Sequence, residues 1–421
     1  MKKLFYAIHV AVLMALLVAG SAFAQSADPI KIGVMLPLTG VYASGGEDGM
    51  VSVRLAVEAV GGEIAGRPIE LIFEDSAADP EKALEALERL VTREGVQLVL
   101  GPLSSGAGLA VKESAGKYPD TTIIIAGAAA DEITLRDIQP NVFRTTYTGS
   151  QVMFPFGRFA YEELGYRRIV TLAADYSFPY SQIAGFASGF IAAGGEITNR
   201  IWVPLGTSNY ASIMPQLVAA NADAIFIGLG GTDAINFLNQ ADTVGLLDRV
   251  EILGGTIMVD PTVLQTAGEL VEGVYTGSHF SQNLTHDEFV KFDQAFRAAT
   301  NNRVPSLFAA DYYIAAEVAL AALEAVNGNI EDQAAFREAL KGIEMMTARG
   351  PLKFDDYHQV VLTTYITQVQ KVDGEYRNVV IYEYPDSTQF GPFDPEWYIA
   401  QPAPDRTNPT AEAILNAVYA D

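Results

Sequence analysis

The stretch VLGPLSSGAG, residues 99–108, combines residue types that can bind an anion without a charged side chain. An apolar run ends at a Gly-Pro pair, and Ser104, Ser105, Gly106 and Gly108 follow, just before a helical pattern. Hydroxyls donate hydrogen bonds, glycines let the backbone approach a ligand, and a helix N-terminus offers free N–H groups. The stretch therefore predicts an anion site. A serine N-cap and glycines that permit a tight turn would explain the same letters without a ligand.

Residue sets that could perform catalysis or hold a metal are sparse. The sequence has no Cys, which excludes a disulfide framework, a thiolate metal site and a thiol nucleophile. It also lacks a G-x-S-x-G elbow, a Walker loop, a G-x-G-x-x-G after the first strand and an H-E-x-x-H helix. We therefore expect neither an enzyme nor a cofactor or metal requirement.

The histidines and paired acids that remain have structural interpretations. After residue 24 the histidines are His279, His286 and His358. His279 and His286 flank the polar segment SQNLT, so we interpret them as solvated loop residues rather than a metal pair. The pair Asp355 and Asp356 fits a turn better than a catalytic dyad.

The elements that must position these residues alternate between apolar, β-rich runs and helical patterns. Such runs occupy 30–36, 69–75, 96–101 and 121–127, and helical patterns at 48–60 and 79–91 follow the first two. Continuous apolar strands followed by amphipathic helices predict a parallel sheet covered on both faces. Ligands bind such sheets beyond the carboxyl ends of the strands, which is where residues 99–108 fall.

The same alternation restarts after residue 151 and predicts a second α/β lobe of similar topology. Its strands are expected at 168–174, 222–228 and 250–255, with long helices at 286–300 and 306–326 and a hairpin at 360–372 and 378–384. About 397 residues after the leader exceed what one hydrophobic core usually holds, which also predicts two domains.

The N-terminus has the pattern of an export signal. Lys2 and Lys3 precede an apolar run at 4–20, and Ala22-Phe23-Ala24 completes an A-x-A cleavage site. A membrane anchor is the alternative, but small residues close the run and no basic patch follows it. Cleavage after Ala24 removes two lysines and no acid, so the net charge goes from −24 to −26. An exported, strongly acidic protein is a poor partner for nucleic acid or an anionic membrane.

Five motifs carry a resemblance to a known family: KIGVMLPLTGVYASGGEDGM, VLGPLSSGAG, IIIAGAAADEIT, VFRTTYTGSQ and RGPLKFD, in that order. The chain resembles the periplasmic solute-binding proteins of branched-chain amino acid ATP-binding-cassette importers over nearly all of its mature length. The resemblance implies the type I periplasmic binding protein fold, in which two Rossmann-like α/β lobes are joined by a three-strand hinge that closes around a ligand. It also implies the limits of each part: 28–147 with 278–350 for the first lobe, 148–277 with 351–400 for the second, and a tail at 401–421.

The resemblance also implies which residues contact the ligand. In the family, a serine of the GPLSS loop and the loop after the next strand hold the ligand carboxylate, and second-lobe residues complete the site. We expect the ligand contacts to include these positions, the serine that precedes Ser105, and aromatic residues that form the walls. The full set is Tyr42, Ser104, Ser105, Ala128, Ala130, Tyr176, Phe178, Thr232, Asp233 and Thr256. For the aromatic residues, packing at the hinge is the alternative interpretation.

Two of these positions depart from the family pattern. Members that bind amino acids usually carry Thr where this chain has Ala130, and an acid for the ligand ammonium where it has Thr256. A buried ammonium without acceptors costs several kcal/mol. Either Asp233 replaces the missing acid, or the ligand is an organic acid without an ammonium, and a ring-bearing ligand is among the options.

The function that the resemblance implies is ligand capture for an importer. We expect a monomeric periplasmic subunit that binds an amino acid or related small carboxylate between its lobes and delivers it to the permease subunits. A free sensor subunit for a signalling receptor is the alternative, since the same fold occurs in receptor ectodomains. An exported hydrolase would require a nucleophile and base that the sequence does not show.

Overall fold

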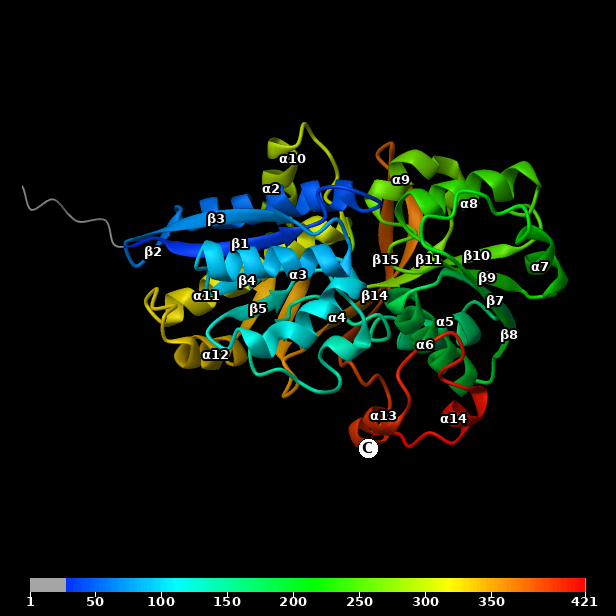
Figure 1. Ribbon diagram of the computed structural model, residues 1–421. Helices are drawn as coiled ribbons and strands as arrows, with labels where there is room; N and C mark the ends of the chain where they lie inside the picture. The colour runs from blue at the N-terminus through cyan, green and yellow to red at the C-terminus, as the bar shows by residue number, and fades with distance from the viewer. Residues whose placement is uncertain (1–27, 421) are drawn as a thin grey trace, which may run out of the picture.

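The computed structural model describes residues 28–420, so the expected leader and its cleavage site lie outside the described residues. Two sheets, each covered by helices, stand side by side along the long axis of the molecule (Figure 1). Within the described residues, no helix is long and apolar enough to cross a membrane.

The first sheet contains six strands in the order β2-β3-β1-β4-β5-β6, all parallel except the short pairing of β2 with β3. The strands are β1 (Ile30–Leu36), β2 (Glu63–Ile64), β3 (Arg67–Asp75), β4 (Leu98–Leu100), β5 (Thr122–Ile125) and β6 (Val142–Arg144). The helices between them are α2 (Ala43–Ala59), α3 (Pro80–Glu88) and α4 (Ser105–Ser114). The start of α3 follows its sequence signals, because Asp79 accepts a hydrogen bond from the backbone N–H of Lys82 and proline occupies the first turn.

Three further helices return to the first sheet from the C-terminal half of the chain: α10 (Asp287–Ala299), α11 (Leu307–Ala325) and α12 (Gln333–Lys341). Helix α11 packs along α2, and nearly all of its apolar side chains are buried. The second turn of α11 lies at the end of the sheet at which β1 terminates, because Tyr312 donates a hydrogen bond to the carbonyl of Met35.

The second sheet contains nine strands in the order β12-β13-β14-β11-β10-β9-β7-β8, with β15 paired to β14. Its parallel part consists of β7 (Arg168–Ala174), β8 (Glu196–Val203), β9 (Ala224–Gly228), β10 (Glu251–Gly254) and β11 (Tyr275–Ser278). The antiparallel part consists of β12 (Glu344–Thr347), β13 (Gly350–Phe354), β14 (Val360–Val372) and β15 (Glu375–Ser387).

Helices cover both faces of this second sheet, as the continuous apolar strands predict. Alternate residues of β7 enter different cores, with Ile169 and Ala173 on one side and Val170 and Leu172 on the other. The first core contains α5 (Met153–Glu162) and α6 (Ser177–Ala192), and the second contains α7 (Met214–Ala219), α8 (Gly231–Thr243) and α9 (Pro261–Ala267). The predicted class, two α/β lobes with mainly parallel sheets, is confirmed.

The chain passes between the two sheets three times: after β6, after β11 and after α12. Strands β12 and β13 extend the second sheet, although the predicted limits place residues up to 350 with the first lobe. The lobe boundaries themselves remain a prediction.

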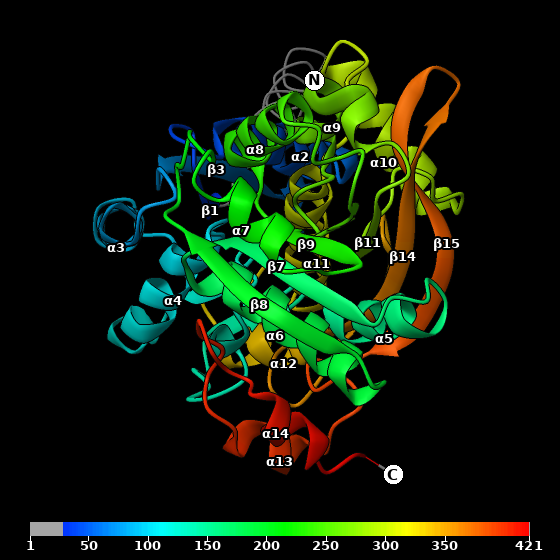
Figure 2. The same cartoon turned by 90° about the vertical axis from the view of Figure 1, so that its right-hand side faces the viewer.

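The C-terminal segment runs beneath both lobes. Its helices α13 (Pro395–Ala400) and α14 (Ala411–Leu415) lie below α6, and α14 packs against it (Figure 2). On the first lobe, Arg136 donates hydrogen bonds to the carbonyls of Ile399 and Gln401 at the end of α13.

Candidate functional site

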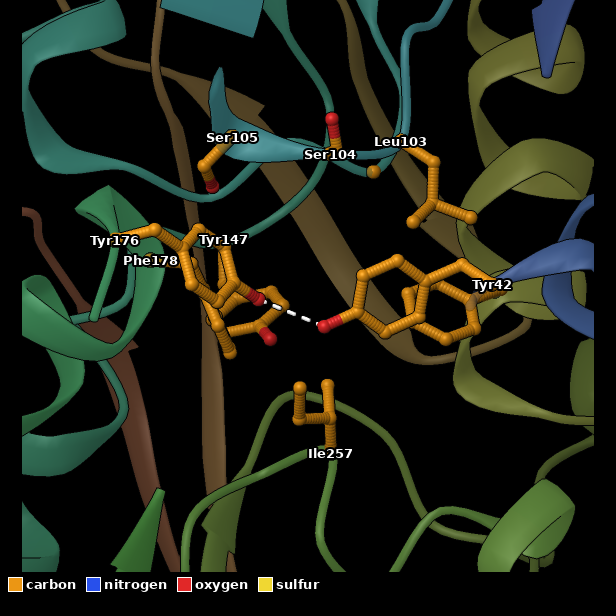
Figure 3. A pocket seen from close by; sticks show the side chains of 10 residues that line it. Tyr42, Leu103, Ser104, Ser105, Tyr147, Tyr176, Phe178 and Ile257 are labelled. Atoms are coloured by element: carbon orange, nitrogen blue, oxygen red, sulfur yellow. Dashed lines mark hydrogen bonds between the residues drawn. The ribbon is translucent and has the colours of Figure 1, made fainter. Parts of the chain in front are cut away.

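A cavity lies where the carboxyl ends of the parallel strands of both sheets face each other (Figure 3). The space enclosed between its side chains is about 20 Å³, room for about one water molecule, and the volume including the open mouth is about 270 Å³. The segments after β1, β4, β5, β6, β7 and β10 and the first turn of α11 contribute its lining, which consists of Tyr42, Leu103, Ser104, Ser105, Gly127, Tyr147, Tyr176, Phe178, Ile257 and Phe308. Five of the predicted ligand contacts are in this set: Tyr42, Ser104, Ser105, Tyr176 and Phe178.

The two serines at the start of α4 have different roles. Ser104 is the N-cap: its hydroxyl accepts from the N–H of Ala107 and donates to the carbonyl of Ala78, 3.0 Å away. Ser105 Oγ accepts from the N–H groups of Ala129 and Ala130, at 3.0 and 2.9 Å. Its own proton has no acceptor within residues 28–420, so the hydroxyl can donate to a ligand in the cavity.

The side chains of Ala128 and Ala130 do not line the cavity, although both positions were predicted to contact the ligand. Both methyl groups are buried in the core between the first sheet and its helices, beside Ile133. The contribution of this loop is made by its backbone, since it supplies the N–H groups that Ser105 accepts.

Aromatic rings form most of the cavity wall. The phenol oxygens of Tyr42 and Tyr176 form a 2.8 Å hydrogen bond between the loop after β1 and the loop after β7 (Figure 3). Phe308 lies beside Tyr42, and Phe178 meets Tyr147 edge to face with ring centroids 6.3 Å apart. Burial raises the pKa of Tyr42 to about 12 and that of Tyr176 well above its ordinary value, so both phenols are neutral at physiological pH.

Three predicted second-lobe contacts lie outside the lining. Thr256 Oγ1 accepts from Gln182 Nε2 and donates to the carbonyl of Gly277, both at 2.9 Å, so its hydroxyl is already used. The next residue, Ile257, reaches the cavity instead. Thr232 is exposed in the first turn of α8, and Asp233 Oδ2 accepts from the N–H of Gly206 at 2.8 Å, which fixes a neighbouring loop.

The lining is electrically neutral. Of the residues within 28–420 that form the wall, none carries an acidic or basic side chain. Desolvation raises the pKa of Asp233, the acid that could have replaced the missing family carboxylate, and its carboxylate points to the loop at residue 206. The cavity therefore offers hydroxyl and N–H donors and apolar surface, and no charged partner for an ammonium.

The interpretation of His279 as a solvated loop residue is wrong. Its ring is fully buried and stacks on Tyr147, with centroids 4.1 Å apart, and its Nε2 lies 2.8 Å from Asp311 Oδ1. Arg349 Nη1 approaches the same oxygen at 3.3 Å. His286 is partly buried and caps α10 through Nδ1, which accepts from the N–H of Phe289. In the described part of the chain, no group of three His, Asp or Glu residues could hold a metal.

The expected turn at the paired acids is present. Asp355 Oδ1 accepts hydrogen bonds from the backbone N–H groups of Tyr357 and Gln359, at 2.8 and 2.9 Å. These bonds give the carboxylate a structural role at the start of β14.

Sequence reasoning missed five residues of the wall: Leu103, Gly127, Tyr147, Ile257 and Phe308. Tyr147 belongs to the motif VFRTTYTGSQ, so a search for aromatic residues at the ends of strands would have found it. Phe308 had no such signal, because it lies in the first turn of a long helix whose apolar residues are nearly all core positions.

Comparisons with known proteins agree with this architecture. Residues 29–375 match the family model described as Periplasmic binding protein. The chain belongs to this periplasmic binding protein family. It is therefore a solute-binding protein of the kind that serves ABC transporters, and not an enzyme.

The alignments with individual relatives span almost the whole length of those proteins. The Leu/Ile/Val-binding protein homolog 6 of Brucella melitensis is 27% identical over 364 residues, which are 85% of this chain and 92% of that protein. The ABC transporter substrate-binding protein of Sphaerobacter thermophilus is 33% identical, with a TM-score of 0.80 over 86% of this chain and 99% of that one. A solute-binding protein of Rhodopseudomonas palustris, solved with 3,4-dihydroxybenzoic acid, is 27% identical, with a TM-score of 0.81 over 86% of this chain and 98% of that one.

Proposed function

We propose that this binding protein captures an aromatic monocarboxylate without an ammonium group and delivers it to the permease of an ABC importer. The observation that carries the proposal is the composition of the cavity wall. Five aromatic rings and two serines line it, together with Leu103, Gly127 and Ile257, and no charged side chain does so.

The serine end of the cavity suits a carboxylate. Ser105 opens α4, a helix of 10 residues, so the positive end of the helix dipole and its first N–H groups face the same region. The hydroxyl of Ser105 is oriented by two N–H donors and has its proton available. Hydrogen bonds to an ionised acceptor are about twice as strong as bonds between neutral groups, and a carboxylate uses these donors best.

In the part of the chain that the structure describes, the cavity wall has no acidic side chain that could pair with a ligand ammonium. An α-amino acid would bury an ammonium that needs carboxylate or carbonyl acceptors, and an unpaired buried charge costs several kcal/mol. Of the two candidates for this role, Thr256 uses its hydroxyl in two other contacts, and Asp233 Oδ2 accepts from the N–H of Gly206. Of the two ligand classes suggested by the names of the relatives, branched-chain amino acids and benzoic acids, the wall favours the second.

The aromatic wall supplies both affinity and closure. Stacked and edge-to-face contacts favour a planar ring over an aliphatic chain. The hydrogen bond between Tyr42 and Tyr176 joins the two lobes over the cavity, which fits a ligand sealed between them. The leader at 1–24, cleaved after Ala24, would place the protein outside the cytoplasmic membrane as a monomeric partner of the permease.

A ligand screen on the purified protein, expressed from Gln25 onward, tests the proposal. Benzoate and 3,4-dihydroxybenzoate are expected to raise the melting temperature, because a ligand that binds only the folded state stabilises it. Leucine, isoleucine and valine are expected to leave it unchanged at the same concentrations. Stabilisation by these amino acids and by neither benzoate would overturn the proposed ligand class.

A further inference from the structure

Arg144 is a fully buried cation next to the loop that holds Ser105. It is the last residue of β6, and its side chain is 0% exposed. Its guanidinium donates to Gln359 Oε1, to Thr134 Oγ1 and to the carbonyls of Ala128 and Ala130, the last at 2.6 Å. Burial lowers its pKa to about 10, which still leaves the group protonated at neutral pH.

Within residues 28–420, no carboxylate forms an ion pair with this guanidinium. The nearest acids are engaged elsewhere. Asp131 accepts from the hydroxyl and N–H of Ser150, and Asp355 accepts from backbone N–H groups and from Gln389. All of the hydrogen-bond acceptors of Arg144 are neutral, and Asp131, Asp355 and Glu132 stabilise its charge through space without a hydrogen bond to it.

The loop at 128–130 connects this charge to the cavity through one peptide unit. In the peptide between Ala128 and Ala129, the carbonyl accepts from Arg144 Nη1 at 3.4 Å and the N–H donates to Ser105 Oγ at 3.0 Å. The dipole of this peptide therefore points from the cation toward the serine hydroxyl. The N–H of Ala130 reaches Ser105 as well. The carbonyl of Ala130, which accepts the shorter bond from Arg144, belongs to the next peptide unit, whose N–H donates to Ser181 Oγ.

We propose that Arg144 is the countercharge for the ligand carboxylate and the positioning residue for Ser105. The inference rests on the proposed function, since it assumes a carboxylate at Ser105. A buried cation close to the site offsets part of the desolvation cost of a buried anion, and aligned peptide dipoles strengthen each hydrogen bond along the connection. The neutral wall can then accept a carboxylate while no basic side chain enters the cavity.

Arg349 provides a matched comparison. It is also a buried arginine near the passages between the lobes, and burial lowers its pKa to about 10. Its guanidinium contacts Asp311 and the carbonyl of Thr145 and makes no hydrogen bond to the loop at 128–130. Arg349 is therefore as buried as Arg144, but it is paired with an acid. Its substitution is not expected to change the preference of the protein for a charged over a neutral ligand.

The test compares two probes that differ in charge and hardly in shape, benzoate and benzamide, in competition or calorimetric titrations. For Arg144→Met, the Kd of benzoate is expected to rise about 10- to 100-fold, because the charge-assisted hydrogen bond from Ser105 to the carboxylate loses its orientation and its countercharge. The Kd of benzamide is expected to rise by less than about 3-fold. Arg144→Lys keeps the charge and is expected to retain most of the preference for benzoate. In Arg349→Lys, the Kd values of benzoate and benzamide should change by the same factor.

If Arg144→Met lost affinity for benzoate and for benzamide by the same factor, the assignment would be overturned and the proposed function would remain intact. Should this variant not fold, Arg144→Gln, which keeps donors for the carbonyls without a charge, carries the same expectation. A wild-type protein that binds neither probe would overturn the proposed function, and the countercharge assignment with it.

Discussion

The hydroxyl of Tyr42, which follows the first strand of the first lobe, lies 2.8 Å from the hydroxyl of Tyr176, which follows the first strand of the second. Each phenol belongs to a different lobe, so this hydrogen bond exists only when the lobes are closed over the cavity. If one hydroxyl is removed, both rings still line the cavity. A Tyr→Phe variant therefore separates the contribution of lobe closure to ligand binding from the contribution of ring contact.

Tyr176→Phe and Tyr42→Phe are each expected to weaken ligand binding by about 0.5–1.5 kcal/mol, the net value of a typical hydrogen bond. Since both changes remove the same bond, the double variant should lose no more than either single one. Calorimetric titration of the four proteins with benzoate measures this. Tyr180→Phe serves as the control, because the Tyr180 hydroxyl bonds Asp175 outside the cavity. Additive losses in the double variant would show that the two hydroxyls act separately.

Ser105→Ala is expected to weaken benzoate binding by about 1–3 kcal/mol, because it removes the oriented donor and leaves two backbone N–H groups without their acceptor. The matched control is Ser114→Ala at the other end of α4, where a buried serine hydroxyl donates only to the carbonyl of Val111. Titration and thermal unfolding of both variants separate affinity from stability. If Ser105→Ala bound benzoate as tightly as the wild type, Ser105 would not be the anchor.

Thr256→Val should reduce stability rather than affinity, by about 1–3 kcal/mol, because it leaves Gln182 Nε2 without its acceptor in a buried site. Ile257→Ala should instead weaken binding, since Ile257 lines the cavity. Denaturant unfolding and benzoate titration of both variants check the assignment. The reverse pattern, with affinity lost only in Thr256→Val, would restore the predicted contact at residue 256.

Glu317 supplies a prediction about pH. Burial in α11 raises its pKa from 4.5 to about 8, and Oε2 has no hydrogen-bond partner among the described atoms. An acid whose pKa is raised by folding favours the folded state when it is protonated, so this contribution is lost as the pH rises from about 4.5 to about 8. Glu317→Gln should therefore raise the melting temperature at pH 8–9 and change it little below pH 4.5.

The exposed Glu324 on the same helix is the control for this substitution. Because Glu324 is exposed, Glu324→Gln should change the melting temperature only slightly. A Glu317→Gln variant whose stability gain is the same at pH 4 and pH 9 would contradict the assignment of a raised pKa.

The fold could be predicted because its signals are local. Apolar runs such as 30–36 and 168–174 match β1 and β7, and Asp79 caps α3 where the sequence placed the start of a helix. The serine site was also accessible, since a Gly-Pro pair and two serines before a helix describe one strand end. Ser104 and Ser105 nevertheless divide their roles between capping and ligand, and only the hydrogen bonds reveal this division.

The second half of the site could not be predicted with the same accuracy, because it depends on register and on contacts distant in sequence. Thr256 and Ile257 differ by one position, and the pairing of Thr256 with Gln182 decides which of them turns inward. His279 lies in a loop, as predicted, but it is buried rather than solvated, because Asp311, 32 positions later, pairs with it. Arg144 gave no functional signal, because its connection to Ser105 runs through the backbone of another loop.

The most direct test of the central claim compares two ligands that differ by one ammonium group. Phenylacetate and phenylglycine share a ring and a carboxylate, and only phenylglycine carries the α-ammonium. Calorimetric titration of the wild-type protein should give at least about 100-fold tighter binding for phenylacetate, because the neutral wall leaves a buried ammonium unpaired. Equal or tighter binding of phenylglycine would contradict the account.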